Sequence, residues 1–109
     1  MPNGNLFHNR AAPASGERFD TLLAHGPLLI ERIVSSPRIV QQEYCQQQDE
    51  WVVLLAGEAQ LQVAGERRTL RGGDYLFLPA GTPHRVESAS DGALWLAVHL
   101  YPACANSTS

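Results

Sequence analysis

Short apolar runs separated by turn residues constrain the fold of this sequence most. Turns rich in glycine, proline or serine follow these runs at a spacing of roughly 8–12 residues, which is typical of strands in all-β proteins. The runs are residues 28–34, 39–46, 51–56, 59–63, 67–71, 75–78, 84–88 and 94–101. Residues 59–63 alternate clearly, with Ala59, Leu61 and Val63 on one face and two glutamines on the other. No strand–helix–strand alternation appears, so the pattern predicts an all-β barrel or sandwich.

The two ends of the chain lack this pattern. Residues 1–14 are rich in Asn, Pro and Gly, which predicts a flexible arm or an extended strand that pairs with a partner subunit. Residues 17–24 are compatible with one or two helical turns, which residues 25–27 (HGP) would end. Residues 103–109 are polar and predict a disordered tail. The expected organisation is one barrel domain over residues 15–102, flanked by an arm and a tail.

Size and charge exclude several classes of function. The chain has 109 residues and a formal net charge of -3, which indicates one soluble domain with its own core. All 8 basic residues are arginine, so Schiff-base chemistry on a lysine is excluded. The acidic balance leaves no basic patch for nucleic acid, and no apolar stretch reaches the roughly 18 residues that cross a bilayer. Because no N-terminal apolar run has the length of a signal peptide, the sequence predicts a cytoplasmic protein.

Residues 73–87 direct one histidine toward the interior of this barrel. Their sequence is GDYLFLPAGTPHRVE. Pro79 ends the hydrogen-bond ladder of the preceding strand, and Gly81 permits a left-handed turn, so a new strand begins at His84. Side-chain alternation puts His84 and Val86 on one face and the charged residues on the other, so His84 is predicted to point inward near the rim. An imidazole there is a metal ligand, a general base or a hydrogen-bonded core histidine.

The same segment resembles the second conserved motif of the cupin superfamily. The matching glycines, proline and histidine are Gly73, Pro79, Gly81 and His84. Upstream, Glu50 followed by six residues and Gly57 resembles the end of the first cupin motif. The resemblance covers residues 28–101 and implies a double-stranded β-helix, the jelly-roll barrel of small single-domain bacterial cupins. It also implies a homodimer, formed by edge strands that pair across subunits.

The first motif departs from the family at its imidazole ligands. In cupins it usually begins with two histidines, one residue apart, three or four residues before the glutamate. With a three-residue gap these positions are Tyr44 and Gln46 in this chain. With a four-residue gap they are Glu43 and Cys45. The asparagine that often closes the second motif is replaced by Ser88.

The resemblance implies a divalent transition metal (Fe, Mn, Ni or Zn), and this sequence offers a reduced set of ligands for it. Gln46 supplies a carbonyl oxygen, Glu50 a carboxylate and His84 an imidazole. Such a set would bind an ion more weakly than the family's three histidines and one glutamate. In the last run, His99 shares a face with Trp95. If that face lies inside the barrel, His99 points toward the same cavity as His84.

Three functions remain open from the sequence. The first is a metal-dependent enzyme acting on a small molecule. In it Gln46, Glu50 and His84 hold the ion, and Tyr44 or His99 assists proton transfer. The second is a binding or sensing module without catalysis, which holds a small polar ligand through the same three side chains. The third is a structural dimeric barrel that has lost its site.

Overall fold

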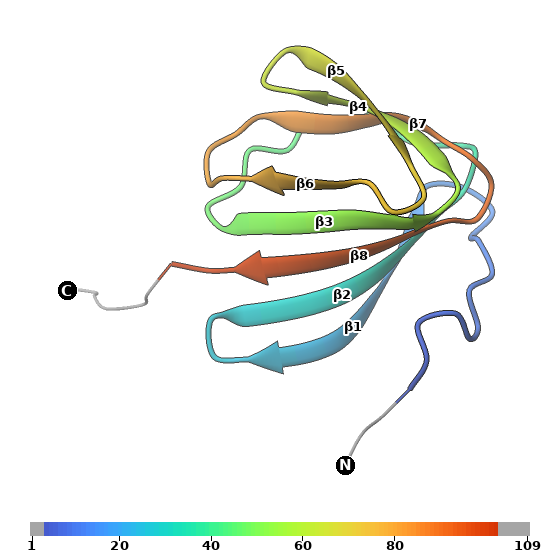
Figure 1. Ribbon diagram of the computed structural model, residues 1–109, viewed down its shortest axis with the longest axis horizontal. Coiled ribbons are helices and arrows are strands. Elements are labelled where there is room, and N and C mark those ends of the chain that lie inside the picture. Colours follow the sequence, from blue (N-terminus) through green and yellow to red (C-terminus); the bar gives the residue numbers. More distant parts are fainter. Residues whose placement is uncertain (1–3, 103–109) are drawn as a thin grey trace.

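The computed structural model describes residues 4–102, and these residues form an all-β fold (Figure 1). The strands are β1 Glu17–His25, β2 Leu28–Ser35, β3 Asp49–Ala56, β4 Glu58–Val63, β5 Glu66–Arg71, β6 Tyr75–Leu78, β7 His84–Ala89 and β8 Ala93–Leu100. They build a five-stranded sheet, β1-β2-β8-β3-β6, and a three-stranded sheet, β5-β4-β7. All their pairings are antiparallel. The predicted double-stranded β-helix is confirmed. Within residues 4–102 no helix has the length and apolar character required to cross a membrane.

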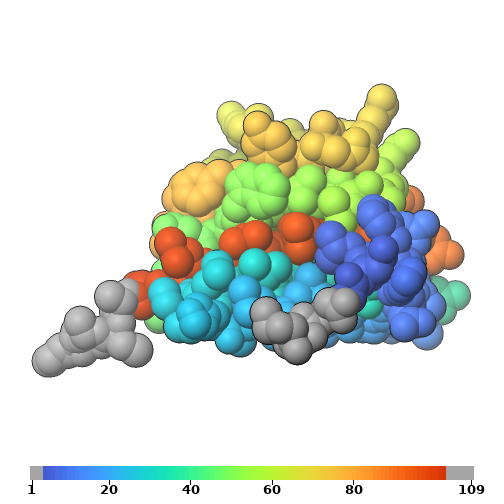
Figure 2. Space-filling model, turned by 60° about the horizontal axis from the view of Figure 1, so that its bottom comes forward, coloured from blue at the N-terminus to red at the C-terminus, as the bar shows by residue number. Residues whose placement is uncertain are grey.

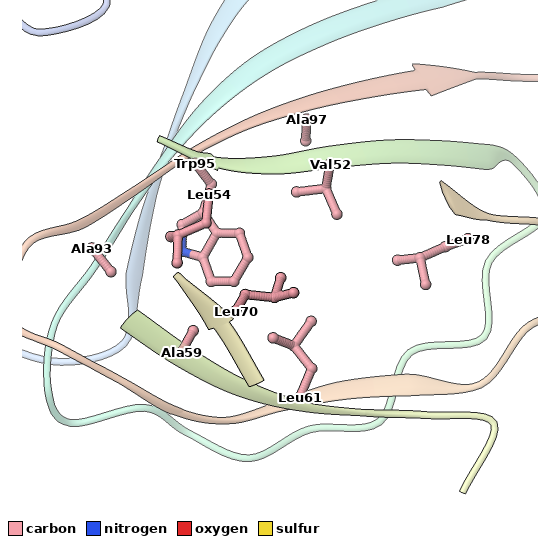
Figure 3. Close-up of a cluster of buried hydrophobic side chains, with 9 residues drawn as sticks. All are labelled: Val52, Leu54, Ala59, Leu61, Leu70, Leu78, Ala93, Trp95 and Ala97. Carbon is pink, nitrogen blue, oxygen red and sulfur yellow. The ribbon is translucent and has the colours of Figure 1, made fainter. Parts of the chain in front are cut away.

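An apolar core fills the space between the two sheets (Figure 3). Both sheets contribute to it, through Val52, Leu54, Ala59, Leu61, Leu70, Leu78, Ala93, Trp95 and Ala97. The alternation predicted for residues 59–63 is present, because Ala59 and Leu61 are buried while Gln60 is exposed. Each fully buried leucine contributes roughly 1.5–3 kcal/mol through its removal from water. This core leaves polar side chains at the end of the barrel where β3 and β7 begin and β8 ends.

Residues 17–24 form a strand, so the expectation of helical turns there was wrong. β1 pairs antiparallel with β2 along almost its whole length, from Glu17 opposite Ser35 to His25 opposite Leu28. A tight turn at Gly26, whose φ is 56°, brings the two segments together. The pairing satisfies the backbone hydrogen-bonding groups of residues 17–24. The free energy gained from these hydrogen bonds outweighs the weak local preference of the segment for helix.

Residues 39–46 do not form a strand, which corrects a second prediction. Only Tyr44 pairs with the sheet, through a bridge to His84 in which the two backbones exchange hydrogen bonds of 2.7 and 2.9 Å. The segment leaves the five-stranded sheet after β2, touches the edge of β7 at this pair, and returns to β3. Its polar run of glutamines contributes no apolar face that would hold a longer strand in place.

The described part of the N-terminal segment, residues 4–16, lies against its own chain (Figure 2). Arg32 is buried, pairs with Asp20 at 2.7 Å and donates to the backbone carbonyls of Leu6, His8 and Asn9. Arg18 donates to two further carbonyls of the segment. The segment contains no strand in its described residues, so the predicted pairing with a partner subunit stays a prediction. The predicted tail, residues 103–109, lies outside the described residues.

Candidate functional site

A cavity of about 100 Å³ extends from the polar end of the barrel, at Glu50 and His99, to Glu17, which lies near the start of β8 through the pairing of β1 with β2. A ligand of modest size fits such a volume. Its polar lining combines three carboxylates, two imidazoles, a phenol and an amide, from Glu17, Glu31, Glu50, His84, His99, Tyr44 and Gln46. Its apolar lining consists of Phe19, Ile33, Val52, Leu61, Leu78, Val86 and Trp95. The structure therefore brings all five side chains singled out in the sequence into one cavity.

His84 enters the cavity from the first residue of β7, with 8% of its surface exposed. Its Nδ1 lies 3.0 Å from the carbonyl oxygen of Thr82. Because a carbonyl oxygen can only accept, Nδ1 carries a proton and donates it to this bond. In the neutral ring, Nε2 then keeps its lone pair. Nε2 faces Glu50 across 3.9 Å, a separation too long for a hydrogen bond.

Glu50 is the second residue of β3, and 7% of its surface is exposed. The amide nitrogen of Gln46 donates to Glu50 Oε1 at 2.9 Å. The backbone of Gln46 is also tied to the corner that precedes His84, since its carbonyl accepts a 2.8 Å hydrogen bond from Gly81. The three predicted ligands thus form one cluster of neighbouring side chains.

Tyr44 lies beside His84, with the two rings stacked at 5.8 Å between centroids and 26° between planes. Their backbone bridge fixes this arrangement. Burial, together with the charge of Glu17, raises the pKa of the Tyr44 phenol above its ordinary value. The phenol therefore stays protonated at neutral pH and can donate a hydrogen bond to a ligand.

His99 points into the same cavity, because the face of β8 that carries Trp95 is the buried one. Its Nε2 lies 3.0 Å from Glu31 Oε1, and its Nδ1 lies 3.3 Å from the amide nitrogen of Gln48. Burial lowers the pKa of His99, but the hydrogen bond with Glu31 and the charges of Glu50 and Glu31 outweigh it, so the pKa is raised. Both ring nitrogens are engaged, so proton transfer by His99 requires it to give up one of these contacts.

Sequence reasoning missed two acidic residues of the cavity, Glu17 on β1 and Glu31 on β2. The Ser35 hydroxyl donates to Glu17 Oε2 at 2.6 Å, and the Trp95 indole nitrogen donates to that hydroxyl at 3.0 Å. Burial raises the pKa of Glu17, the Ser35 bond opposes this, and the charge of Glu50 adds to the increase. The carboxylates of Glu17 and Glu50 therefore interact across the cavity.

A signal for one of these residues is present in the sequence. In residues 28–34 (LLIERIV), alternation places Glu31 on the same face as Ile33, an apolar residue that also lines the cavity. Glu17 had no such signal, because its segment is recognisable as a strand only through its pairing with β2.

The alternative register of the first motif does not face the cavity. Glu43 and Cys45 are both exposed, and neither belongs to the lining. The Cys45 thiol instead lies 3.6 Å from the carbonyl oxygen of Gly81. Tyr44, although 38% exposed, and Gln46 do line the cavity.

The side chains present do not fit an ordinary transition-metal site. Within residues 4–102, no group of three or more His, Cys, Asp or Glu side chains is placed to hold an ion. The cluster offers two strong donor atoms, His84 Nε2 and Glu50 Oε1. Gln46 turns its amide NH₂ group, and no lone pair, toward that same carboxylate oxygen. Protein sites for Fe, Mn, Ni or Zn normally supply three or more strong ligands.

Comparison with known proteins identifies the family. Residues 37–99 match the family model of the cupin domain. A solved structure from Ralstonia eutropha JMP134, named a "putative mannose-6-phosphate isomerase", is 39% identical, with 94% of this chain and 100% of that chain covered and a TM-score of 0.80. A Thermus thermophilus protein is 24% identical over 93% of this chain and 98% of its own, with a TM-score of 0.79. KdgF from Halomonas sp. is 17% identical over 80% and 82% of the two chains, with a TM-score of 0.74. No curated protein matches. The chain belongs to the cupin family.

Proposed function

We propose that this chain is a small-molecule-binding cupin whose ligand occupies the cavity at the polar end of the barrel. One observation carries the proposal. His84 Nε2 points into the cavity, 3.9 Å from Glu50 Oε1, and has no hydrogen-bond partner among the described residues. Within residues 4–102, the buried side-chain atoms without a partner are Arg18 Nε and Arg85 Nε, so His84 Nε2 is instead open to solvent inside the cavity. A ligand in the cavity can therefore reach Nε2 and donate a hydrogen bond to it.

The rest of the lining supports the same function. Small-molecule sites are concave, mostly apolar, and carry a few polar groups that orient the ligand. Here Ile33, Leu61 and Val86 supply apolar surface, while His84 and Glu50 supply the polar groups. The ligand would bury its carbon skeleton against the first three and direct its polar group toward the other two.

Binding is tested with ¹⁵N-labelled protein, free of a histidine tag, and a library of small polar molecules. The indole N–H of Trp95 reports on the cavity, because it is bonded to Ser35 beneath Glu17. The indole of Trp51, which is 37% exposed and does not line the cavity, serves as the internal control. We expect ligands that shift the Trp95 resonance and leave Trp51 in place. His84→Ala should weaken their binding by roughly tenfold or more, through loss of a buried hydrogen bond.

The control variant is His25→Ala, which removes an exposed histidine at the end of β1 and should leave binding unchanged. A library in which no molecule shifts Trp95 would contradict the proposal. Metal content is measured on the same samples. A stoichiometric Fe, Mn, Ni or Zn ion that disappears in both His84→Ala and Glu50→Gln would replace this proposal with the metal-dependent enzyme that the family resemblance implies.

A further inference from the structure

We infer that the cavity selects a small cationic ligand, such as an alkylamine, over carboxylates and phosphates. This inference rests on the proposed function and names the class of ligand. It starts from three carboxylates, those of Glu17, Glu31 and Glu50, that line one cavity of about 100 Å³.

Within residues 4–102, no permanent cation compensates these carboxylates. The chain contains no lysine, and none of its arginines lines the cavity. Several arginines form ion pairs elsewhere: Arg18 and Arg32 with Asp20, Arg67 and Arg85 with Glu87, and Arg68 with Glu66. The arginines, all of which lie in the described part of the chain, therefore place their charge outside the cavity.

The three carboxylates differ in their partners. Glu31 pairs with the imidazole of His99 at 3.0 Å. Among the described residues, Glu50 accepts a hydrogen bond only from the neutral amide of Gln46, and His84 Nε2 lies 3.9 Å away. Glu17 accepts one only from the hydroxyl of Ser35. Two of the three carboxylates thus have neutral hydrogen-bond donors as their close contacts. The negative charges of Glu17 and Glu50 are therefore available to pair with a cationic ligand.

An ammonium group matches this arrangement. It carries three N–H donors and no acceptor. The cavity presents acceptors to it: the oxygens of Glu50 and Glu17, and His84 Nε2, which no side chain of residues 4–102 hydrogen-bonds. The rings of Tyr44 and Phe19 also line the cavity and can receive a cation on their faces.

An anionic ligand meets the opposite situation. Carboxylate and phosphate groups are normally bound by arginine, lysine or clustered backbone N–H groups. This cavity would place such a ligand against like charges. The similar structure from Ralstonia eutropha JMP134 carries the name of an enzyme for a phosphorylated sugar. On charge alone, a sugar phosphate is a poor ligand for the cavity of this chain.

Three probes with one carbon skeleton isolate the effect of charge: isobutylamine, isobutyl alcohol and isobutyrate. Each is titrated into ¹⁵N-labelled full-length protein at pH 7.5 and constant ionic strength, with the indole resonances of Trp95 and Trp51 as cavity reporter and control. We expect isobutylamine to bind on the order of tenfold or more tightly than isobutyrate, with the alcohol between them. The advantage of the amine should shrink as salt is added.

Variants of the cavity carboxylates test whether these groups cause the preference for the amine. Glu17→Gln and Glu50→Gln should each weaken amine binding by roughly five- to tenfold and leave the alcohol almost unaffected. Glu58→Gln, which neutralises an exposed carboxylate outside the cavity, should change none of the three affinities. Two cavity variants are used, so that one remains if the other fails to fold.

The outcomes separate this inference from the proposed function. If isobutyrate shifts Trp95 at the same or lower concentration than isobutylamine, the charge preference is wrong and the binding site stands. If the amine binds best but neither cavity variant weakens it, the carboxylates are not its cause and the inference is also overturned. If no probe shifts Trp95, both the proposed function and the inference fail for ligands of this size.

Discussion

At the scale of single residues, the polar groups of the cavity are held in place by the protein itself. The carbonyl of Thr82 fixes His84, the amide of Gln46 fixes Glu50, and the hydroxyl of Ser35 fixes Glu17. Side chains that are already ordered lose little rotamer freedom when a ligand binds. For the ligand proposed above, these side chains are therefore preorganised, with His84 Nε2 as the acceptor open to it.

The Glu31–His99 pair gives a prediction on pH. His99 has a raised pKa, so the folded state holds its proton more tightly than the unfolded chain does. The pair thus stabilises the fold fully below the pKa of the unfolded chain, near the ordinary histidine value of 6.5, and this contribution is lost as the pH rises through the pKa of the folded state. Glu31→Gln should lower the pKa of His99. It should also cost about 1 kcal/mol of unfolding free energy at pH 5.5, and less at pH 8.5.

NMR titration of the histidine side chains and urea unfolding at the two pH values measure these effects. The resonances of His25, at the exposed end of β1, are the internal control and should not differ between the parent protein and the variant. An unchanged titration of His99 in the variant would show that Glu31 is not the group that raises its pKa.

The candidate site could be predicted from the sequence wherever a residue belonged to a motif or to a recognisable strand. The corner between Pro79 and Pro83 places His84, and alternation along the last strand places His99. Glu17 could not be predicted, because it faces the cavity only through the pairing of β1 with β2. The hydrogen bond of Gln46 to Glu50 was also out of reach, since a loop side chain takes its orientation from tertiary contacts.

At the scale of elements, turns determine where the strands of the two sheets meet. Gly57 links β3 in the large sheet to β4 in the small one, with a φ of 95°. A Cβ at this position would lie 2.6 Å from Ser90 Oγ and 3.1 Å from Ala93 Cα. The close approach of the backbones here requires glycine on both conformational and steric grounds.

Gly57→Ala is expected to destabilise the fold by roughly 2–4 kcal/mol, because backbone strain and overpacking act together. Gly65→Ala is the matched control. Gly65 has a similar φ of 82°, but nothing lies within 4 Å of a Cβ built there. It should cost about 1 kcal/mol, from backbone conformation alone. Equilibrium urea unfolding measures both losses, and equal losses would show that the contacts around Gly57 relax at no cost.

Most strands could be predicted from the spacing of apolar runs and turns, and the two errors have a common cause. The pattern assigns a strand to residues 39–46 and helical turns to residues 17–24. In the structure, residues 39–46 form a loop and residues 17–24 belong to strand β1. Whether a weakly patterned segment becomes a strand depends on an available neighbour. β2 is that neighbour for residues 17–24, whereas β7 offers residues 39–46 a single pair at Tyr44.

At the scale of the whole molecule, the outer surface of the large sheet is apolar at one edge. Trp51, Tyr75 and Phe77 are 37%, 65% and 59% exposed. Trp51 is opposite Phe77 in the β3–β6 ladder, and its ring lies 5.6 Å from that of Tyr75. β6 is also an edge strand of the sheet. Exposed edges and aromatic patches of this kind are typical of protein interfaces.

We expect a second copy of the chain to cover this patch, in line with the homodimer that the family resemblance implies. Replacing Tyr75 and Phe77 together by glutamate should weaken dimerisation by roughly 30-fold or more, because buried aromatic side chains dominate interface energies. Light scattering coupled to size-exclusion chromatography measures the mass. Val40→Glu, at a 73% exposed position on the loop before β3, is the matched control and should remain dimeric.

The test requires that the double variant keep its barrel, and the inward side chains of β6 favour this. Leu76 and Leu78 alternate with the two replaced residues and pack inward, so β6 keeps its contacts with the core. The Trp95 indole resonance should therefore stay in place while the mass falls to that of a monomer. A parent protein that is monomeric at about 100 μM, or a double variant that remains dimeric with Trp95 unmoved, would show that the aromatic edge of β6 does not form the interface.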